Sequence, residues 1–119
     1  MKKNIKKEEK LRLKSDFDYV RKNGIKFIGK NFILVVAKHE DESLKCGVIC
    51  SKKYNKRAVK RNRARRILWE SFRLLKESIS PAHFVLITRK WIADKKQQDV
   101  QKEMEYLLKK AKVWVDSYS

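Results

Sequence analysis

The chain has 119 residues and a formal net charge of +18, from 32 lysines and arginines against 14 acidic residues. Apolar residues make up 42% of it, which excludes a disordered tail and suffices for one folded domain. This charge favours nucleic acid over an anionic membrane as the partner, because the apolar residues are needed for a core. No apolar run approaches membrane-spanning length and the N-terminus does not resemble a signal peptide, so we expect a cytoplasmic protein that binds no membrane.

The N-terminal residues predict an arm followed by a short helix. Residues 1–12 are basic and poor in apolar side chains, so we expect a mobile arm, with residues 13–119 as a single domain. Residues 13–24 predict a helix that Ser15 caps and that Gly24 ends in a left-handed conformation. Its apolar side chains Phe17 and Val20 share one face.

Four further segments have the patterns of strands. Residues 25–28 predict a short extended piece, and the β-branched and aromatic run 31–37 predicts a strand. Residues 45–51 predict the next strand, which we expect to pair antiparallel with 31–37 across the polar turn 40–43. Residues 83–88 follow Pro81 and predict another.

A basic stretch lies between the strands. Residues 52–66 contain nine lysines or arginines and no acidic residue. A helix beginning near Arg57 and reaching about Ser78 places one apolar stripe at 3.6-residue spacing: Ala64, Ile67, Leu68, Ser71, Phe72 and Leu75. The arginines lie opposite or beside this stripe, so we expect a row of guanidinium groups in solvent, which suits phosphate.

The last helix is expected over 95–118, with an apolar stripe of Val100, Met104, Leu107, Leu108, Ala111 and Val115. The order is therefore α-β-β-β-α-β-α, an α+β fold in which helices pack on a small sheet as a single-domain sandwich.

The sequence offers no catalytic or metal-binding constellation. Cys46 and Cys50 are expected to be core residues, because their spacing relative to His39 and His83 matches no zinc pattern. The acidic residues do not converge as a metal-dependent nuclease requires. We therefore predict no catalytic residue and no metal ligand in the protein.

The motif Ser51-Lys52-Lys53…Ala58-Val59-Lys60-Arg61-Asn62-Arg63-Ala64-Arg65-Arg66-Ile67 resembles the signature of the bacterial ribonuclease P protein subunit. The resemblance covers roughly residues 11 to 112 and includes Asp16-Phe17, Asn31-Phe32 and Thr88-Arg89-Lys90. It implies a left-handed βαβ crossover, against the usual right-handed rule.

The resemblance also implies a function. The family's protein binds a catalytic RNA and the 5′ leader of precursor tRNA, with Mg²⁺ held mainly by the RNA and no obligate protein partner. The implied RNA-binding residues are Lys52, Lys53, Lys56, Arg57, Lys60, Arg61, Asn62, Arg63, Arg65 and Arg66. The implied leader cleft contains Phe17, Arg21 and Val35, the last two at positions where many relatives carry aromatic residues. The alternatives are a structural RNA-binding protein, such as a ribosomal protein of similar fold, and a metal-dependent nuclease acting alone.

Overall fold

The computed structural model describes residues 5–50, 56–90 and 92–115. Its elements are η1 (Lys7–Glu9), α1 (Lys14–Asn23), β1 (Ile25–Ile28), β2 (Phe32–Ala37), β3 (Lys45–Ile49), α2 (Ala58–Leu75), η2 (Lys76–Ser78), β4 (His83–Thr88), η3 (Ile92–Asp94) and α3 (Gln97–Lys110). This order confirms the expected α+β sandwich. Within the described ranges, no helix has the length and apolar character needed to cross a bilayer.

The four strands form one sheet in the order β1-β2-β4-β3. β1 pairs antiparallel with β2, β2 pairs antiparallel with β4, and β3 runs parallel to β4. The expected hairpin between residues 31–37 and 45–51 is therefore wrong, because β4 lies between these two strands. A short polar connection suggested direct pairing, but it joins strands that are not neighbours.

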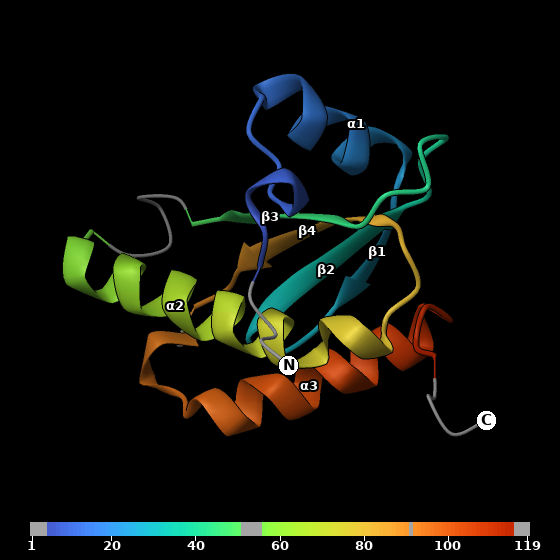
Figure 1. Ribbon diagram of the computed structural model, residues 1–119. Helices are drawn as coiled ribbons and strands as arrows, with labels where there is room; N and C mark the ends of the chain where they lie inside the picture. The colour runs from blue at the N-terminus through green and yellow to red at the C-terminus, as the bar shows by residue number, and fades with distance from the viewer. Residues whose placement is uncertain (1–4, 51–55, 91, 116–119) are drawn as a thin grey trace.

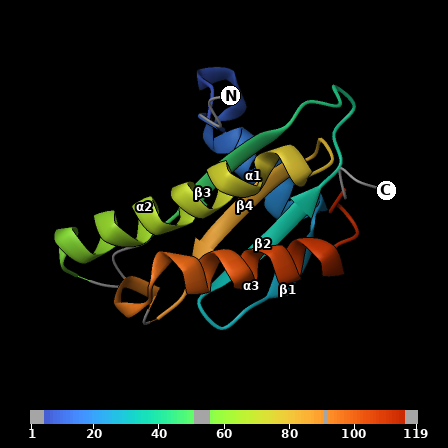
Figure 2. The same ribbon diagram turned by 60° about the horizontal axis from the view of Figure 1, so that its bottom comes forward.

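The parallel pair β3 and β4 is joined by a crossover through α2. In Figure 2, α2 lies in front of the sheet and both strands run toward the lower left. Viewed along that direction, β4 lies to the left of β3, so the crossover is left-handed. The handedness that the family resemblance implied is thus confirmed.

Helices cover both faces of the sheet (Figure 1): α2 and α3 lie on one face and α1 on the other. The larger core lies between the sheet and the α2–α3 pair and includes the fully buried Phe32, Phe72 and Phe84. The smaller core lies under α1 and contains Val20 and Val35. Strand alternation supplies both cores, because successive side chains point to opposite faces.

The two ends of α1 differ from expectation. Leu13 is the N-cap, no side chain caps the helix, and Ser15 lies within the first turn. Gly24 has a φ of −86°, which is not left-handed. A Cβ at Gly24 would lie 2.5 Å from the Val20 carbonyl oxygen and 2.8 Å from Val35 Cγ1, so close packing on the sheet requires glycine there.

The N-terminal segment differs as well. Residues 1–4 lie outside the described residues, but residues 5–12 pack against the domain instead of forming a mobile arm. Leu11 is buried and its N–H donates to the Cys46 carbonyl at 3.0 Å. Glu9 pairs with Lys76 at 2.8 Å. Residues 5–12, which include η1, are therefore attached to β3 through Leu11 and to the end of α2 through Glu9.

The last helix is shorter than predicted. α3 ends at Lys110, and Lys112 takes a positive φ of 61° that turns the chain. Trp114 then forms an isolated antiparallel bridge with Ile79. Val115, expected in the apolar stripe, is 48% exposed, whereas Val100, Met104, Leu107 and Leu108 are buried.

Candidate nucleic-acid interface

The apolar stripe predicted for the central helix is confirmed. The buried residues of α2 are Ala64, Ile67, Leu68, Ser71, Phe72 and Leu75. The polar member, Ser71, donates its hydroxyl to the Ile67 carbonyl at 2.8 Å, so its burial leaves no unpaired group. Because this stripe fixes the rotation of α2 about its axis, it also fixes which side chains face solvent.

The first turn of α2 concentrates positive charge where a helix tolerates it least. Arg57 is the N-cap without a side-chain cap, and no acidic residue occurs in the first turn. The N-terminal end of a helix carries a partial positive charge that favours anions. Lysines and arginines there add to this potential, so the end of α2 favours a bound polyanion such as phosphate.

Backbone contacts hold some of the arginines. Arg63 Nε donates to the Ala93 carbonyl at 2.7 Å, which directs its guanidinium along the η3 loop. Arg61 donates to the Lys56 carbonyl at 2.8 Å and so holds the turn before the helix. Carbonyl contacts orient a guanidinium without cancelling its charge.

Three arginines of α2 have no carboxylate partner among the described residues. Lys60 pairs with Asp94 at 3.0 Å. Arg65 donates to the Asn62 side-chain oxygen at 2.9 Å, and Arg66 is exposed. In the described part of the chain, no salt bridge joins a carboxylate to the three residues that we call the arginine face: Arg63, Arg65 and Arg66.

The predicted basic set therefore splits into two groups. Residues 56–66 of that set lie together on α2 and the turn before it. Lys52 and Lys53 lie outside the described residues. The structure therefore describes the part of the motif from residue 56 to residue 66, and this part forms one continuous basic surface.

A groove of about 850 Å³ runs along the outer side of α2. Lys10 lies 5.3 Å from the centre of the Trp69 ring, which links the N-terminal segment to the helix. Arg73 donates from Nε to Glu70 at 3.0 Å, and this bond lowers the pKa of the Glu70 carboxyl. The groove is lined by Ile5, Lys10, Arg63, Arg65, Arg66, Ile67, Trp69, Glu70, Arg73 and Gln97.

The three residues expected in a leader cleft have different environments. Phe17 is half-buried against Gly47 and Leu11, and Arg21 is exposed on the same side of α1 one turn later. Val35 is fully buried beneath α1. The expectation that Val35 contacts a leader is therefore corrected: its side chain packs α1 on the sheet and offers no surface.

Sequence reasoning missed an apolar row on the α1 face of the sheet. Ile33 pairs with Ile87 across β2 and β4, and Ile87 pairs with Ile49 across β4 and β3. All three are only half-buried, in contrast to the fully buried Val35 and Val85 one row away. Strand alternation placed these residues on one face, but only the register aligns them. We call Ile33, Ile49 and Ile87 the isoleucine row.

The isoleucine row and the arginine face lie at the same end of the sheet. Ile49 and Ile87 are near the C-terminal ends of the parallel strands β3 and β4, and α2 begins on that side (Figure 1). The isoleucine row lies on the α1 face and α2 on the opposite face, so this end of the sheet carries an apolar surface on one side and unbalanced guanidinium groups on the other. These are the two kinds of contact that a flexible nucleic-acid strand uses, for its bases and for its phosphates. The fold and this surface define a small, basic α+β sandwich of the nucleic-acid-binding class.

Comparisons with known proteins narrow this class. The sequence model described as Ribonuclease P matches residues 5–112. The chain is 33% identical over 110 residues to the ribonuclease P protein component of Exiguobacterium sp., covering 92% of this chain and 96% of that protein. It is 30% identical over 116 residues to the component of Bacillus velezensis, covering 97% and 99%. The chain belongs to the ribonuclease P protein family.

Solved structures agree with this assignment. The ribonuclease P protein of Staphylococcus aureus superimposes with a TM-score of 0.79 at 26% identity, covering 89% of this chain and 97% of that one. The protein from Thermotoga maritima superimposes with a TM-score of 0.75 at 27% identity, covering 86% and 96%. The family's enzyme is a tRNA-processing ribonuclease, of which this chain is the protein component.

Proposed function

We propose that α2 is the surface that binds the ribonuclease P RNA, with the arginine face against its phosphates. One observation carries the proposal: the apolar stripe turns these three arginines toward solvent and the η3 loop orients Arg63, while no acidic side chain of the described residues pairs with them. Guanidinium groups of this kind match phosphate oxygens in geometry as well as charge. We extend the surface to Lys56, Arg57, Lys60, Arg61 and Asn62, and to Lys52 and Lys53 from the motif.

The 5′ leader of precursor tRNA is proposed to lie across the isoleucine row beside α1. Phe17 borders this surface from α1, and the exposed Arg21 supplies a cation on the same side. A single strand needs apolar or planar contacts for its bases and cations for its backbone, and this region offers both. The leader would then be bound without sequence-specific hydrogen bonds to the protein.

The chemistry of cleavage is assigned to the RNA together with Mg²⁺. Mg²⁺ prefers oxygen ligands and keeps several waters. Among the described residues, one cluster has metal-ligand spacing, and two of its three donors are imidazoles, which do not suit Mg²⁺. We therefore propose that the protein positions RNA and neutralises charge, that no other protein is needed, and that it works in the cytoplasm.

Reconstitution tests this assignment. The purified protein is added to ribonuclease P RNA and precursor tRNA at a Mg²⁺ concentration where the RNA alone is slow. We expect accurate 5′ maturation to be restored. A structural RNA-binding protein would restore nothing. Accurate cleavage by the protein without the RNA would instead identify a nuclease that acts alone, and either result contradicts the proposal.

A further inference from the structure

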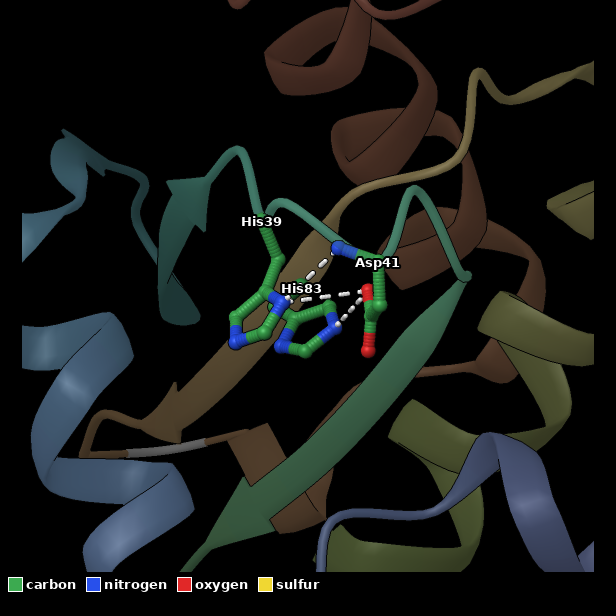
Figure 3. Close-up of side chains that lie close together, drawn as sticks. All are labelled: His39, Asp41 and His83. Carbon is green, nitrogen blue, oxygen red and sulfur yellow. Dashed lines mark hydrogen bonds and ion pairs between the residues drawn. The ribbon is translucent and has the colours of Figure 1, made fainter.

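His39 and Asp41, two residues apart, meet the distant His83 at the end of the sheet remote from the arginine face. His39 and Asp41 lie in the loop between β2 and β3, and His83 is the first residue of β4 (Figure 3). His39 Nδ1 lies 3.1 Å from Asp41 Oδ1, and His83 Nε2 lies 3.3 Å from the same oxygen. These three donor atoms lie within 4.8 Å of one another.

We propose that His39, Asp41 and His83 form a binding site for a transition-metal ion of the Zn²⁺ class. Zinc binds imidazole nitrogen at about 2.0–2.1 Å and carboxylate oxygen at about 2.0–2.2 Å, so tetrahedral ligand atoms lie about 3.3–3.5 Å apart. The two nitrogen–oxygen separations are close to this spacing. All three ligand atoms lie within 4.8 Å of one another, and the His39 ring is only half-buried.

Two contacts at His39 Nδ1 compete for the same nitrogen. Its Nδ1 accepts the Asp41 backbone N–H at 3.2 Å, which requires an unprotonated nitrogen. The same nitrogen faces the Asp41 carboxylate oxygen at 3.1 Å, which requires a protonated one. One tautomer of the ring cannot meet both requirements, and a metal bound at Nδ1 would take the lone pair that the Asp41 N–H occupies, so metal binding requires the ring to turn away from that N–H.

The two rings also lie face to face. His39 and His83 are stacked with centroids 4.2 Å apart and planes 10° apart, an arrangement that disfavours positive charge on both rings. Neutral imidazole is the form that binds metal.

Neighbouring groups hold the ligands in place. Ser43 donates its backbone N–H at 3.0 Å and its hydroxyl at 2.9 Å to Asp41 Oδ1, which fixes the carboxylate. The Tyr19 ring of α1 contacts His39 edge-on with centroids 5.0 Å apart. Outer contacts of this kind orient metal ligands and raise affinity. A bound ion would thus tie the 38–44 loop to β4, leaving the remaining coordination positions to water.

Zinc titration of the full-length, chelator-stripped protein tests the site by calorimetry. We expect one Zn²⁺ per chain and an affinity at least about 10-fold lower in His39→Ala and in Asp41→Asn. Glu40→Gln removes a charge from the same loop, and Cys50→Ser removes the half-buried thiol. Both controls should bind as the wild type does. Absence of zinc binding by the wild type, or unchanged affinity in both ligand variants, would overturn the proposal.

Two measurements on the wild type keep the test independent of any variant. The chain has two histidines, so its NMR spectrum contains two sets of imidazole signals, and both should shift together until one equivalent of Zn²⁺ is reached. Co²⁺ should give absorption without a thiolate charge-transfer band. Unmoved histidine signals, or a thiolate band, would place the metal elsewhere. None of these measurements involves RNA, so their failure leaves the proposed function intact.

Discussion

The ring of Phe17 occupies the space that a side chain at residue 47 would need. A Cβ on Gly47 would lie 2.3 Å from Phe17 Cε1 and 2.4 Å from Cζ, both far inside van der Waals contact. Gly47 is buried in β3 and Phe17 comes from α1, so this close approach sets how near the helix sits to the sheet.

Replacing Gly47 with alanine should therefore destabilise the fold through Phe17. We expect Gly47→Ala to lower the free energy of unfolding by about 1–3 kcal/mol, the usual cost of overpacking. In a Phe17→Ala background the same change should cost at least about 1 kcal/mol less, because the clash is gone. Denaturant unfolding of the four proteins measures this coupling. Equal costs in both backgrounds would show that the two residues do not interact.

The arginine face should control RNA affinity through phosphate contacts. Removing two cations with Arg63→Ala and Arg66→Ala should reduce the slope of log K against log salt concentration by about 1.4–1.8. The matched control removes two cations, Lys109 and Lys110, at the end of α3 away from the start of α2 (Figure 1). Filter binding of ribonuclease P RNA across salt concentrations separates the two. If both double variants behave alike, net charge rather than the arginine face determines affinity.

Arg21 should distinguish precursor from mature tRNA. If the leader lies beside α1, Arg21→Ala weakens holoenzyme binding to precursor tRNA and leaves mature tRNA unaffected, because only the precursor has a leader. Arg21 is exposed, so its loss does not disturb the core. Lys22→Ala, an exposed neighbour on the same helix, is the control. Equal losses for precursor and mature tRNA would remove Arg21 from the leader surface.

The two thiols should react at different rates in the folded protein. Cys46 is fully buried, and burial raises the pKa of its thiol well above the usual value. Cys50 is half-buried beyond the end of β3. We expect a thiol reagent to label one cysteine in the native state, and Cys50→Ser to abolish labelling until denaturant is added. Two fast thiols in the native protein would contradict the buried position of Cys46.

The docked N-terminal segment should contribute stability that depends on pH. Partial burial raises the pKa of Glu9, but the Lys76 side chain and the Lys6 backbone N–H, which both donate to its carboxylate, together with the charges of both lysines outweigh it, so the pKa is lowered overall from 4.5. A lowered pKa in the folded state means that the contribution is present above pH 4.5 and is lost as the pH falls below it. Glu9→Gln should thus lower the Tm at neutral pH and have a shrinking effect under acid conditions.

The exposed Glu8 provides the control, because Glu8→Gln changes the same charge without breaking an ion pair. Thermal melts followed by circular dichroism across the acid range compare the three proteins. A difference between Glu9→Gln and the wild type that stays constant with pH would exclude the Lys76 pair as its cause.

Periodicity predicted the parts of the fold that depend on one element. The buried stripe of α2 follows from spacing alone, because a helix shows its buried side at a fixed interval, whereas the bounds of β4 follow from a nearly continuous apolar run after Pro81. The positions of the arginines follow from the same stripe. These features needed no knowledge of neighbouring elements.

Contacts between elements that are distant in sequence could not be predicted from the periodicity of a single element. β3 pairs with β4 rather than with β2, and a short turn between β2 and β3 carries no signal against a hairpin. The burial of Val35 depends on α1 lying above it. His39 and His83 are adjacent only because their strands are neighbours at that end, through a register that the sequence does not display.

The central position of β4 has a consequence for synthesis on the ribosome. The strand that completes the sheet is translated after β1, β2, β3 and α2, so a nascent chain that ends before residue 83 lacks the strand that joins β2 to β3. Until β4 is made, the edges of β2 and β3 that will pair with it have no partner strand, while the arginines of α2 have already been translated. Long-range pairing of this kind forms late and slowly, so the basic helix emerges before the domain that orients it.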